Sequence, residues 1–470
     1  MKRHLLAVAL GLTTIASGHA LPQGSDAGPT HHSGRIDTSE VWHPSGNPHI
    51  LNGDVHTGDS VTLTIMPGCT VQVSTAAELY TGYANPGSII AVGKADSMIT
   101  FTSLSDTVPG AWDNIGFYGQ TISTARMSYC EVLFGGKVSE KLGAVRVDYT
   151  NIGFDHNLVR KSGSNGVWLS SSGSFGDFTN NTIAGCTRYA VHIPAKNVPT
   201  LGVGNTLTGN AKNGIEVDGS VIRSSGTWLN HGVPYVVTDD VAIDSNATVT
   251  IAAGCTIALD PNVEFYVGYA SPGGLIADGT EGQITFTSSI DPPGPGDWSE
   301  LSFYANSVDS QCQLKNCKTQ YAGDYRGNIH IADCTPTVTG CDIGYSARWG
   351  IYLSGIEYPS AAQLRADNFI HDYMDGDIRE PGVGISEKPL RPICATEPPT
   401  IVHGVLFLPG DTSCRPQAAS LLDADGRRVM DLGPGANDVR ALSPGVYFVR
   451  EEPQASSHKP QAVRKVILTE

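Results

Sequence analysis

The chain has few charged residues, and its basic residues are outnumbered. Only 16% of its 470 residues are charged, and 46 acidic against 30 basic side chains give a formal net charge of −16. Proteins that bind nucleic acids through phosphates need clustered Lys and Arg to displace counterions, and no such cluster occurs in this sequence. The composition therefore argues against a nucleic-acid partner.

Long apolar runs are also missing. No stretch of about 18 consecutive apolar residues is present, so we expect no transmembrane span in the mature chain. The 54 glycines lack the three-residue period of collagen, and an apolar content of 40% is too high for a disordered chain. The composition predicts a folded globular or repeat protein.

Signatures of metal and catalytic sites are absent as well. There is no C-x-x-C pair, and the single C-x4-C pair, Cys312 and Cys317, has no partner pair at zinc-ligand distance. No G-x-S-x-G motif occurs, and the glycine-rich segments follow strand-like runs without a helix start, so no phosphate cradle is indicated. We predict no metal site and no cofactor, and we assign no catalytic residue.

The N-terminus has the features of an export signal. Residues 1–20 combine two basic residues, an apolar stretch and small residues before a cleavage site, which is typical of a secretory signal peptide. Residues 21–35 are rich in Gly, Ser, His and Pro and predict a flexible leader, and the proline-rich residues 386–400 predict a linker. We expect a protein that is secreted or displayed on the outer cell surface.

An internal duplication fills the middle of the chain. The segment YTGYANPG at 80–87 recurs as YVGYASPG at 266–273, which is 186 residues later. Other landmarks that keep this spacing are Trp42 and Trp228, Pro48 and Pro234, LTIMPGCT at 63–70 and VTIAAGCT at 249–256, and Trp112 with Phe117 and Tyr118 against Trp298 with Phe303 and Tyr304. We therefore define copy 1 as residues 36–222 and copy 2 as residues 223–385.

A shorter repeat of 24 residues lies within copy 1. Its landmarks are the alternating apolar runs at 166–169, 190–193 and 214–217, and the asparagines Asn157, Asn181 and Asn205. Each unit is too short to fold alone and lacks the i, i+3, i+4 spacing of a helix, so the units must stack to bury their apolar sides. The pattern predicts an all-β parallel β-helix in which each unit is one coil and the asparagines stack at a corner.

These coils, together with the recurring order of an apolar strand, P-G-C-T or A-G-C-T, I-T-F-T-S and a tryptophan, carry a family resemblance. The sequence resembles the right-handed parallel β-helix proteins of the pectate-lyase-like superfamily, and the resemblance covers most of the chain. It implies a right-handed solenoid whose active surface is the outer side of a parallel sheet. Two separate β-sandwiches would not explain the 24-residue step.

Residues 401–470 predict a small antiparallel β-sandwich domain. Asp425-Gly426 between two apolar runs is a hairpin signal, and Pro444-Gly445 predicts a turn before the next strand. Three segments in order resemble the type A C-terminal sorting domain of the type IX secretion system, which implies contact with the secretion machinery. The matching segments are Asp423–Val429, Leu442–Arg450 and Arg464–Leu468. An ordinary β-sandwich without a sorting role is the alternative.

Several cysteines occupy positions where an inward-facing apolar residue is expected. Cys69 and Cys255 are equivalent in the two copies, as are Cys130 and Cys317, and we predict that these four are buried. Export also makes disulfides possible, and we expect at least one of three pairs to be oxidised in exported protein. The three candidate pairs are Cys317–Cys341, Cys312–Cys334 and Cys394–Cys414.

One line of outward residues is a candidate binding surface. On an alternating strand, the residue between two inward positions faces solvent, and stacked coils place equivalent residues in a column. The candidates are Arg146, Trp168, His192 and Glu216 in copy 1, and His330 and Tyr352, which match the first two of these, in copy 2. Aromatic rings can stack on the apolar faces of sugars, and the polar groups can bond hydroxyls or carboxylates.

Three functions are consistent with this column. The first is a non-catalytic secreted or surface protein that binds a polysaccharide or another cell-surface component. The second is a divergent polysaccharide lyase or glycoside hydrolase around Arg146, His192 and Glu216, although Glu216 has no obvious second carboxylate. The third is a structural surface protein, in which case the column is an ordinary solvated sheet face.

Overall fold

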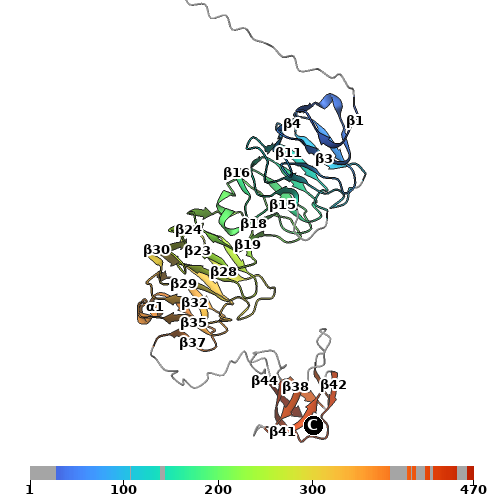
Figure 1. The fold of residues 1–470 in the computed structure, drawn as a ribbon. Helices are drawn as coiled ribbons and strands as arrows, with labels where there is room; N and C mark the ends of the chain where they lie inside the picture. The colour runs from blue at the N-terminus through green and yellow to red at the C-terminus, as the bar shows by residue number, and fades with distance from the viewer. Residues whose placement is uncertain are drawn as a thin grey trace, which may run out of the picture. The chain divides into compact units, whose positions relative to one another are not determined.

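The computed structural model divides the chain into two compact units, residues 1–383 and 384–470 (Figure 1). It describes residues 28–105, 107–137, 143–381, 400–403, 405–408, 419–423, 427–433, 435–451 and 463–469. The first unit is a parallel β-helix and the second is a small β domain, so the predicted all-β fold class is confirmed. The predicted signal peptide (1–20) and the predicted linker up to residue 399 lie outside the described residues.

The coils of copy 1 are three-sided, and each side stacks its strands in parallel on those of neighbouring coils. One side is a six-stranded sheet of β2 (Glu40–Trp42), β4 (Val61–Ile65), β7 (Gly87–Val92), β10 (Arg126–Ser128), β13 (Asn151–Asp155) and β16 (Ser174–Thr179). A second side, here named the column side of copy 1, contains β3 (His49–Thr57), β6 (Leu79–Thr81), β9 (Ile115–Phe117), β12 (Gly143–Val147), β15 (Asn165–Leu169), β18 (Val191–Pro194) and β19 (Ile215–Asp218). The third side contains β5 (Thr70–Val73), β8 (Ile99–Ser103), β11 (Cys130–Leu133), β14 (Leu158–Arg160) and β17 (Thr182–Ala184).

Copy 2 repeats this three-sided arrangement. Its column side, equivalent by the 186-residue offset, is a seven-stranded sheet of β20 (Ser220–Ile222), β23 (Val241–Ile243), β26 (Glu264–Val267), β29 (Glu300–Phe303), β32 (Gly327–Ala332), β35 (Trp349–Ser354) and β37 (Gly376–Arg379). A five-stranded sheet contains β21 (Gly226–Trp228), β24 (Ala247–Ile251), β27 (Gly273–Asp278), β30 (Ser307–Lys315) and β33 (Thr337–Thr339), and α1 (Ala361–Asp367) contacts β33. The remaining side contains β22 (Tyr235–Val237), β25 (Thr256–Leu259), β28 (Ile284–Ser288), β31 (Cys317–Gln320), β34 (Asp342–Gly344) and β36 (Phe369–Ile370).

The two copies do not stack with equivalent sides aligned. Strand β19, at the end of the column side of copy 1, pairs on its other edge with β22, which lies on a different side of copy 2. The column side of copy 2 instead begins at β20, next to the 3-10 helix η2 (Ala195–Thr200), which also contacts β16 and β21. The two column sides therefore belong to separate strand stacks within one solenoid.

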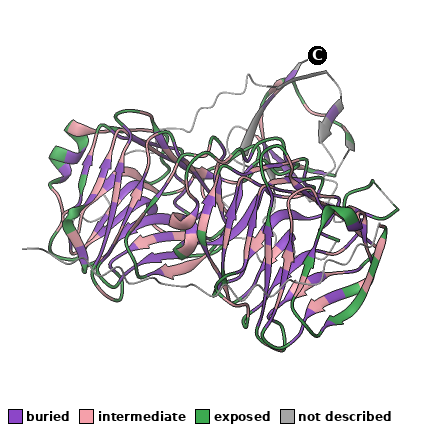
Figure 2. Ribbon diagram, turned by 90° about the horizontal axis from the view of Figure 1, so that it is seen from above, coloured by how far each residue is buried: buried purple, intermediate pink, exposed green. Residues whose placement is uncertain are grey.

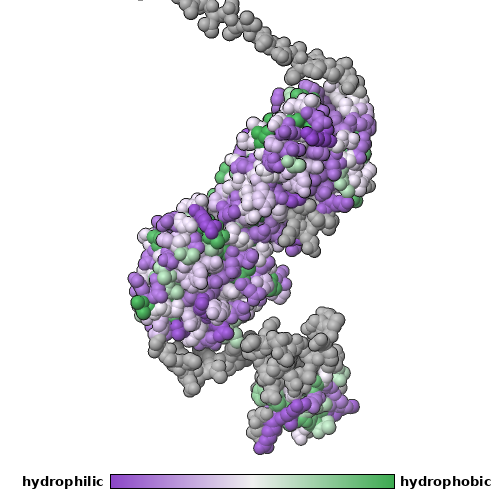
Figure 3. Space-filling model, in the orientation of Figure 1, coloured by the Kyte–Doolittle hydropathy of each residue, from purple (hydrophilic) through white to green (hydrophobic). Residues whose placement is uncertain are grey.

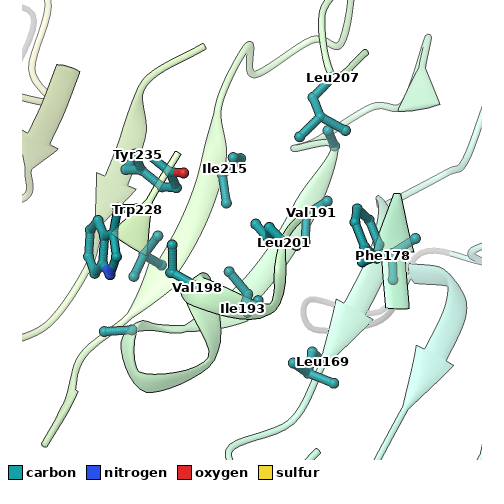
Figure 4. Packing of buried hydrophobic residues seen from close by; sticks show 14 of the residues in the cluster. Leu169, Phe178, Val191, Ile193, Val198, Leu201, Leu207, Ile215, Trp228 and Tyr235 are labelled. Atoms are coloured by element: carbon teal, nitrogen blue, oxygen red, sulfur yellow. The ribbon is translucent and has the colours of Figure 1, made fainter. Parts of the chain in front are cut away.

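Inward residues of successive coils form buried apolar columns, as the 24-residue period predicts. Val167, Val191, Ile215 and Tyr235 are consecutive partners in register, and each is at most 1% exposed. Figure 4 shows Val191, Ile215 and Tyr235 packed at the junction of the copies, and Figure 2 shows buried residues alternating along the strands. Burial of these side chains is the main source of stability for the solenoid.

The predicted asparagine stack is also present at one corner. The backbone N–H of Asn157 donates to Asn181 Oδ1, and the backbone N–H of Asn181 donates to Asn205 Oδ1, both at 2.9 Å. Because Asn157 and Asn181 are buried, these bonds satisfy polar groups that water cannot reach.

Ordered structure begins earlier than the sequence predicts. Strand β1 (Thr30–Ile36) pairs in parallel with β3, so the last part of the expected flexible leader, 21–35, is a strand. The ring of His32 lies 4.2 Å from that of the buried Trp42. This aromatic packing outweighs the flexible character that Gly and Ser give the segment.

The C-terminal unit is a two-sheet β domain with its own apolar core. One sheet has the order β38 (Thr400–His403), β44 (Val463–Thr469), β43 (Gly445–Glu451), β40 (Ala419–Leu422) and β41 (Arg428–Leu432), and the other pairs β39 (Val405–Leu408) with β42 (Gly435–Asp438). All these pairs are antiparallel, as predicted, except β38 with β44, which is parallel. The five-stranded sheet is therefore mixed. β40 and β41 are antiparallel neighbours, although the turn at Asp425-Gly426 lies outside the described residues.

The outer surface of the β-helix is predominantly polar. Figure 3 shows mainly hydrophilic side chains on the visible face, with single apolar residues scattered among them. Within the described part of the chain, no helix has the length and apolar character needed to cross a bilayer.

Candidate functional site

The structure brings the four candidate residues of copy 1 into one outward column. Arg146 pairs in register with Trp168, Trp168 with His192, and His192 with Glu216. These residues come from β12, β15, β18 and β19, which are neighbours about 4.8 Å apart. Residues 22 or 24 apart in the sequence are thus adjacent on the surface of the β-helix.

The same column continues toward the N-terminal end of copy 1. Arg146 is in register with Gly116 of β9, Gly116 with Tyr80 of β6, and Tyr80 with His56 of β3. The rings of His56 and Tyr80 are stacked, with centroids 4.9 Å apart. We name the line from His56 to Glu216 the copy-1 column.

Flat groups lie face to face along the centre of the copy-1 column. The rings of Trp168 and His192 are 5.6 Å apart and nearly parallel, with an interplanar angle of 8°. The guanidinium carbon of Arg146 lies 5.4 Å from the Trp168 ring and 4.9 Å from the Tyr118 ring. Arg146 therefore connects Trp168 to Tyr118, the residue that follows β9, through cation–π contacts.

Each charged group at the end of the copy-1 column has a partner of opposite charge. Glu216 Oε1 accepts from Arg188 Nη2 at 2.9 Å, and Glu216 Oε2 lies 2.9 Å from His192 Nδ1. The other ring nitrogen, His192 Nε2, lies 3.0 Å from Asp218 Oδ2. Arg146 Nη2 similarly donates to Asp148 Oδ2 at 2.6 Å.

This pairing makes two of the predicted residues less accessible than alternation suggested. His192 is only 6% exposed and Glu216 only 9% exposed, whereas Trp168 is half-buried. The cause is the ion-pair cluster itself, since Arg188 and Asp218 lie against the two side chains. The ring of Trp168 and the guanidinium of Arg146 are the more accessible parts of the column.

The protonation states of the cluster follow from these contacts. Burial lowers the pKa of His192, but hydrogen bonds to Asp218 and Glu216 and the charges of these carboxylates raise it further, so its net pKa lies above the ordinary value. Burial raises the pKa of Glu216, but His192 and Arg188 lower it further, so its net pKa lies below the ordinary value. The favoured state is a histidine cation between two carboxylates.

Three polar atoms on the copy-1 column have incomplete hydrogen bonding. Among the residues that the structure describes, His56 Nδ1, Arg146 Nε and Trp168 Nε1 are buried without a hydrogen-bond partner. Buried polar groups normally have hydrogen-bond partners. Hydrogen bonding is therefore less complete along the copy-1 column than at the asparagine corner.

Comparison with known proteins adds no assignment to this site. The chain matches no protein-family model, no curated protein and no solved structure.

A cluster of three tyrosines adjoins Arg146 in copy 1. Tyr80 of β6, Tyr83 of the following turn and Tyr118 after β9 are mutually near-perpendicular, with centroids 5.1 to 6.2 Å apart. Tyr118 donates to Glu78 Oε1 at 2.6 Å, and Arg146 Nη1 lies 3.4 Å from the Tyr118 hydroxyl. Burial raises the pKa of Glu78 to about 7, although the hydrogen bond from Tyr118 lowers it.

The column side of copy 2 places its two predicted residues in register but in a different setting. His330 pairs with Tyr352, and Tyr352 pairs with Arg379, whose guanidinium carbon lies 4.6 Å from the Tyr352 ring. His330 is 3% exposed, and its Nε2 lies 2.8 Å from Ser354 Oγ. Burial and the nearby charge of Arg326 lower the pKa of His330 to about 3, so this histidine is neutral.

The sequence pattern did not single out several residues that build the site. Asp148 and Asp218 lie two positions after column residues, and Arg188 and Arg326 lie in turns before column strands. An i, i+2 search along each strand would have found the two aspartates, because such residues share a face. The tyrosine cluster was visible only as part of the internal repeat.

The described cysteines are buried as predicted, but they do not form the expected disulfides. Cys69, Cys130, Cys255 and Cys317 are buried, as predicted. The eight cysteines that the structure describes are all free thiols, so the expected bridges Cys317–Cys341 and Cys312–Cys334 are not formed. The stacked coils bring both pairs close without joining them, and Cys394–Cys414 lies outside the described residues. Within those same limits, no group of His, Cys, Asp and Glu is arranged to hold a metal ion.

Proposed function

We propose that this protein is secreted or displayed on the outer cell surface and binds a glycan through the copy-1 column without altering it chemically. The observation that carries the proposal is the register of β12, β15, β18 and β19, which aligns a tryptophan, two charge-paired groups and a stacked imidazole on one outward side. A sugar chain laid along the stack would meet a new side chain at each strand, about every 4.8 Å.

The chemistry of the column suits a carbohydrate. The half-buried ring of Trp168 offers a flat apolar surface for a pyranose, and Arg146 and Asp148 offer a donor and acceptors beside it. Aromatic rings flanked by polar groups are the usual components of such binding surfaces.

The pairing of charges supports binding over chemistry. A general base needs an imidazole nitrogen or a carboxylate that is free to accept a proton, but both ring nitrogens of His192 are engaged by Glu216 and Asp218. Glu216 is held by both Arg188 and His192, so its lone pairs are engaged. These groups are arranged as a fixed structural cluster next to the tryptophan.

Native affinity electrophoresis tests the proposal. The full chain is run in gels that contain hydroxyethyl cellulose, galactomannan or polygalacturonate, and at least one polymer is expected to retard it. Trp168→Ala should weaken that retardation about tenfold or more, because a central aromatic contact is lost. Phe369→Ala, which removes an exposed aromatic ring on β36, is the matched control and should leave retardation unchanged. Equal retardation of the Trp168→Ala variant and the unmodified chain would remove this face from consideration.

A second candidate is a divergent polysaccharide lyase or glycoside hydrolase. It is favoured by Glu78, whose pKa near 7 is suited to proton transfer and which lies beside Tyr118, close to Arg146. Incubation with the same three polymers should then release reducing or unsaturated ends, and Glu78→Gln or Arg146→Ala should abolish the release. If no ends are released from any polymer, the binding function stands alone.

The C-terminal unit supports a proposal about export. Described parts of the three segments that resemble a type IX sorting domain lie in one sheet: β41 holds the end of the first segment and is joined through β40 to β43, which pairs with β44. We propose that residues 401–470 direct the chain through the secretion machinery after the signal peptide has been removed. In a host with that system, deletion of 401–470 should leave the protein in the periplasm, as judged by immunoblotting of cell fractions. Unchanged surface or medium localisation would contradict a sorting role.

A further inference from the structure

The tyrosine cluster of copy 1 has a geometric counterpart in copy 2. Tyr266, Tyr269 and Tyr304 lie 186 residues after Tyr80, Tyr83 and Tyr118, and their centroids are 5.1 to 6.1 Å apart at angles of 74 to 83°. Tyr304 donates to Glu264 Oε1 at 2.7 Å, which reproduces the bond from Tyr118 to Glu78. We name these two groups tyrosine site 1 and tyrosine site 2.

A tight turn presents one tyrosine of each site to solvent. Gly82 and Gly268 have positive φ angles of 73° and 68°, and a Cβ at either position would come within 2.2 Å of a backbone nitrogen in the next coil. Only glycine fits these turns, and each turn places the following tyrosine outside the strand. Tyr83 is consequently 68% exposed and Tyr269 is 65% exposed.

One tyrosine of each site, Tyr118 or Tyr304, is held in place by its hydrogen bond to a glutamate. A Cβ on Gly116 would lie 2.4 Å from Glu78 Oε1 and 2.7 Å from the Tyr118 ring, so the missing side chain leaves room for both groups. In copy 2 the equivalent residue is Ser302, whose hydroxyl donates to Glu300 Oε1 at 3.3 Å. Both sites therefore have a carboxylate-held tyrosine and an exposed tyrosine on a rigid sheet.

Each site also has an arginine from a different place in the sequence. Arg146 of β12 reaches the Tyr118 hydroxyl in site 1, whereas Arg326 from the turn before β32 reaches the Tyr304 hydroxyl at 3.5 Å in site 2. Arg146 is in register with Gly116, but the residue in register with Ser302 is His330. The copies have diverged around the tyrosines while keeping the tyrosines, their carboxylates and a nearby guanidinium.

The arginine near each site is already paired with a carboxylate. Arg146 is paired with Asp148, and Arg326 is paired with the buried Glu300. A uronate or sulfated sugar needs an unpaired cation to offset the cost of desolvating its own charge, and the net charge of −16 repels it at long range. An uncharged sugar avoids both costs and uses the exposed rings and hydroxyls.

We infer that tyrosine sites 1 and 2 are two separate binding sites for uncharged pyranose residues, so that the chain is bivalent for a neutral glycan. The inference rests on the proposed glycan-binding function and adds a second site and a substrate class. Because β19 continues into β22 and not into β20, the two sites belong to different strand stacks. They therefore act as two independent attachment points, which raises avidity for a polymer without new contacts.

Isothermal titration calorimetry of the full chain tests this inference. The probes are the neutral hexasaccharides cellohexaose, mannohexaose and laminarihexaose, with a galacturonate hexamer as the charged comparison. At least one neutral probe should bind with two equivalents per chain. Tyr83→Ala and Tyr269→Ala should each reduce this to one equivalent, and the double variant should bind none. Tyr83 and Tyr269 are exposed, so both variants should fold, and Phe369→Ala is again the matched control.

The possible outcomes separate this inference from the proposed function. One equivalent that is weakened by Trp168→Ala and unaffected by Tyr269→Ala would overturn the second site and keep the first. Binding of the charged hexamer alone would overturn the assignment to uncharged sugars and leave glycan binding in place. Absence of binding by all four probes, together with no retardation in any gel, would overturn both.

Discussion

At the scale of single residues, two buried histidines on the column sides have pKa values that are shifted in opposite directions. His192 lies between Glu216 and Asp218, which raise its pKa against the effect of burial. His330 faces Arg326 and Ser354, so burial and a nearby cation lower its pKa to about 3. The neighbours of each ring decide its charge, because both rings are similarly buried.

The first prediction concerns the pH dependence of stability. The raised pKa of His192 means that its contribution is fully present below about pH 6.5 and is lost as pH rises through the folded-state pKa. The lowered pKa of Glu216 keeps the pair intact above about pH 4.5. His192→Asn should therefore cost about 2 kcal/mol at pH 5.5 and clearly less at pH 8.5, as measured by urea unfolding.

His330→Asn provides the control with the opposite sign. The unfolded state binds a proton below about pH 6.5 that folded His330 does not, so the native chain loses stability from this residue as pH falls. The substitution should reduce that loss, and its cost should be smaller at pH 5.5 than at pH 8.5. A pH-independent cost for both variants would show that the two charge states are wrong.

The second prediction concerns the thiols. Burial raises the pKa of Cys69 and Cys255 to about 11 and that of Cys334 to about 12, and a thiol is a poor nucleophile without its proton removed. Cys341 is left out of this prediction because a hydrogen bond with Cys317 lowers its pKa. In native protein at pH 7.5, the seven described cysteines whose pKa burial raises should resist iodoacetamide, whereas unfolded protein should be fully alkylated. Peptide mass spectrometry distinguishes the two, and rapid native labelling or a native disulfide at any of these positions would contradict the structure.

At the scale of strands and turns, the sequence predicted the sheet well and the turns poorly. Alternation and the 24-residue step were enough to place Val167, Val191 and Ile215 in one buried column, because strand periodicity and coil stacking are set locally. The side-chain partners from turns, such as Arg188 beside Glu216, depend on how each loop folds back over the sheet. No period governs those loops, so their contributions could not be read from spacing.

Composition alone also predicted the structure of the terminal segments poorly, because long-range contacts decide it. The Gly, Ser and His of the N-terminal segment suggested a flexible leader, yet His32 packs against Trp42 and β1 pairs with β3. Similarly, the parallel pairing of β38 with β44 in the C-terminal unit joins segments far apart in sequence. Such long-range partners are not encoded in local propensity.

The third prediction concerns the asparagine corner. Asn181 is fully buried, accepts from the Asn157 backbone N–H and donates through Nδ2 to the Phe154 carbonyl at 2.9 Å. Asn181→Ala should lower the free energy of unfolding by about 3 kcal/mol, because it leaves buried backbone groups without partners. Asn151→Ala removes one exposed hydrogen bond to Ser174 and should cost less than about 1 kcal/mol. Equal costs in urea unfolding would contradict the structural role of the stack.

At the scale of the whole β-helix, the duplication produced two related surfaces on one solenoid. The offset of sides at β19 and β22 keeps the copy-1 column and the column side of copy 2 in separate strand stacks. Stability in such a molecule is passed between neighbouring coils, so surface residues can change without loss of the fold. This freedom explains why equivalent positions on the two column sides hold different residues, Arg146 in copy 1 and His330 in copy 2, although the strands beneath them are alike.

The fourth prediction, and the most direct test of the account, is hydroxyl-radical footprinting of the full chain with and without a saturating neutral hexasaccharide. The claim that the column side of copy 1 binds glycan predicts reduced oxidation at Tyr83 and Trp168, with unchanged oxidation at Phe369, which is exposed on β36. Protection confined to residues outside the column sides, or oxidation of Tyr83 and Trp168 that saturating sugar leaves unchanged, would contradict the claim.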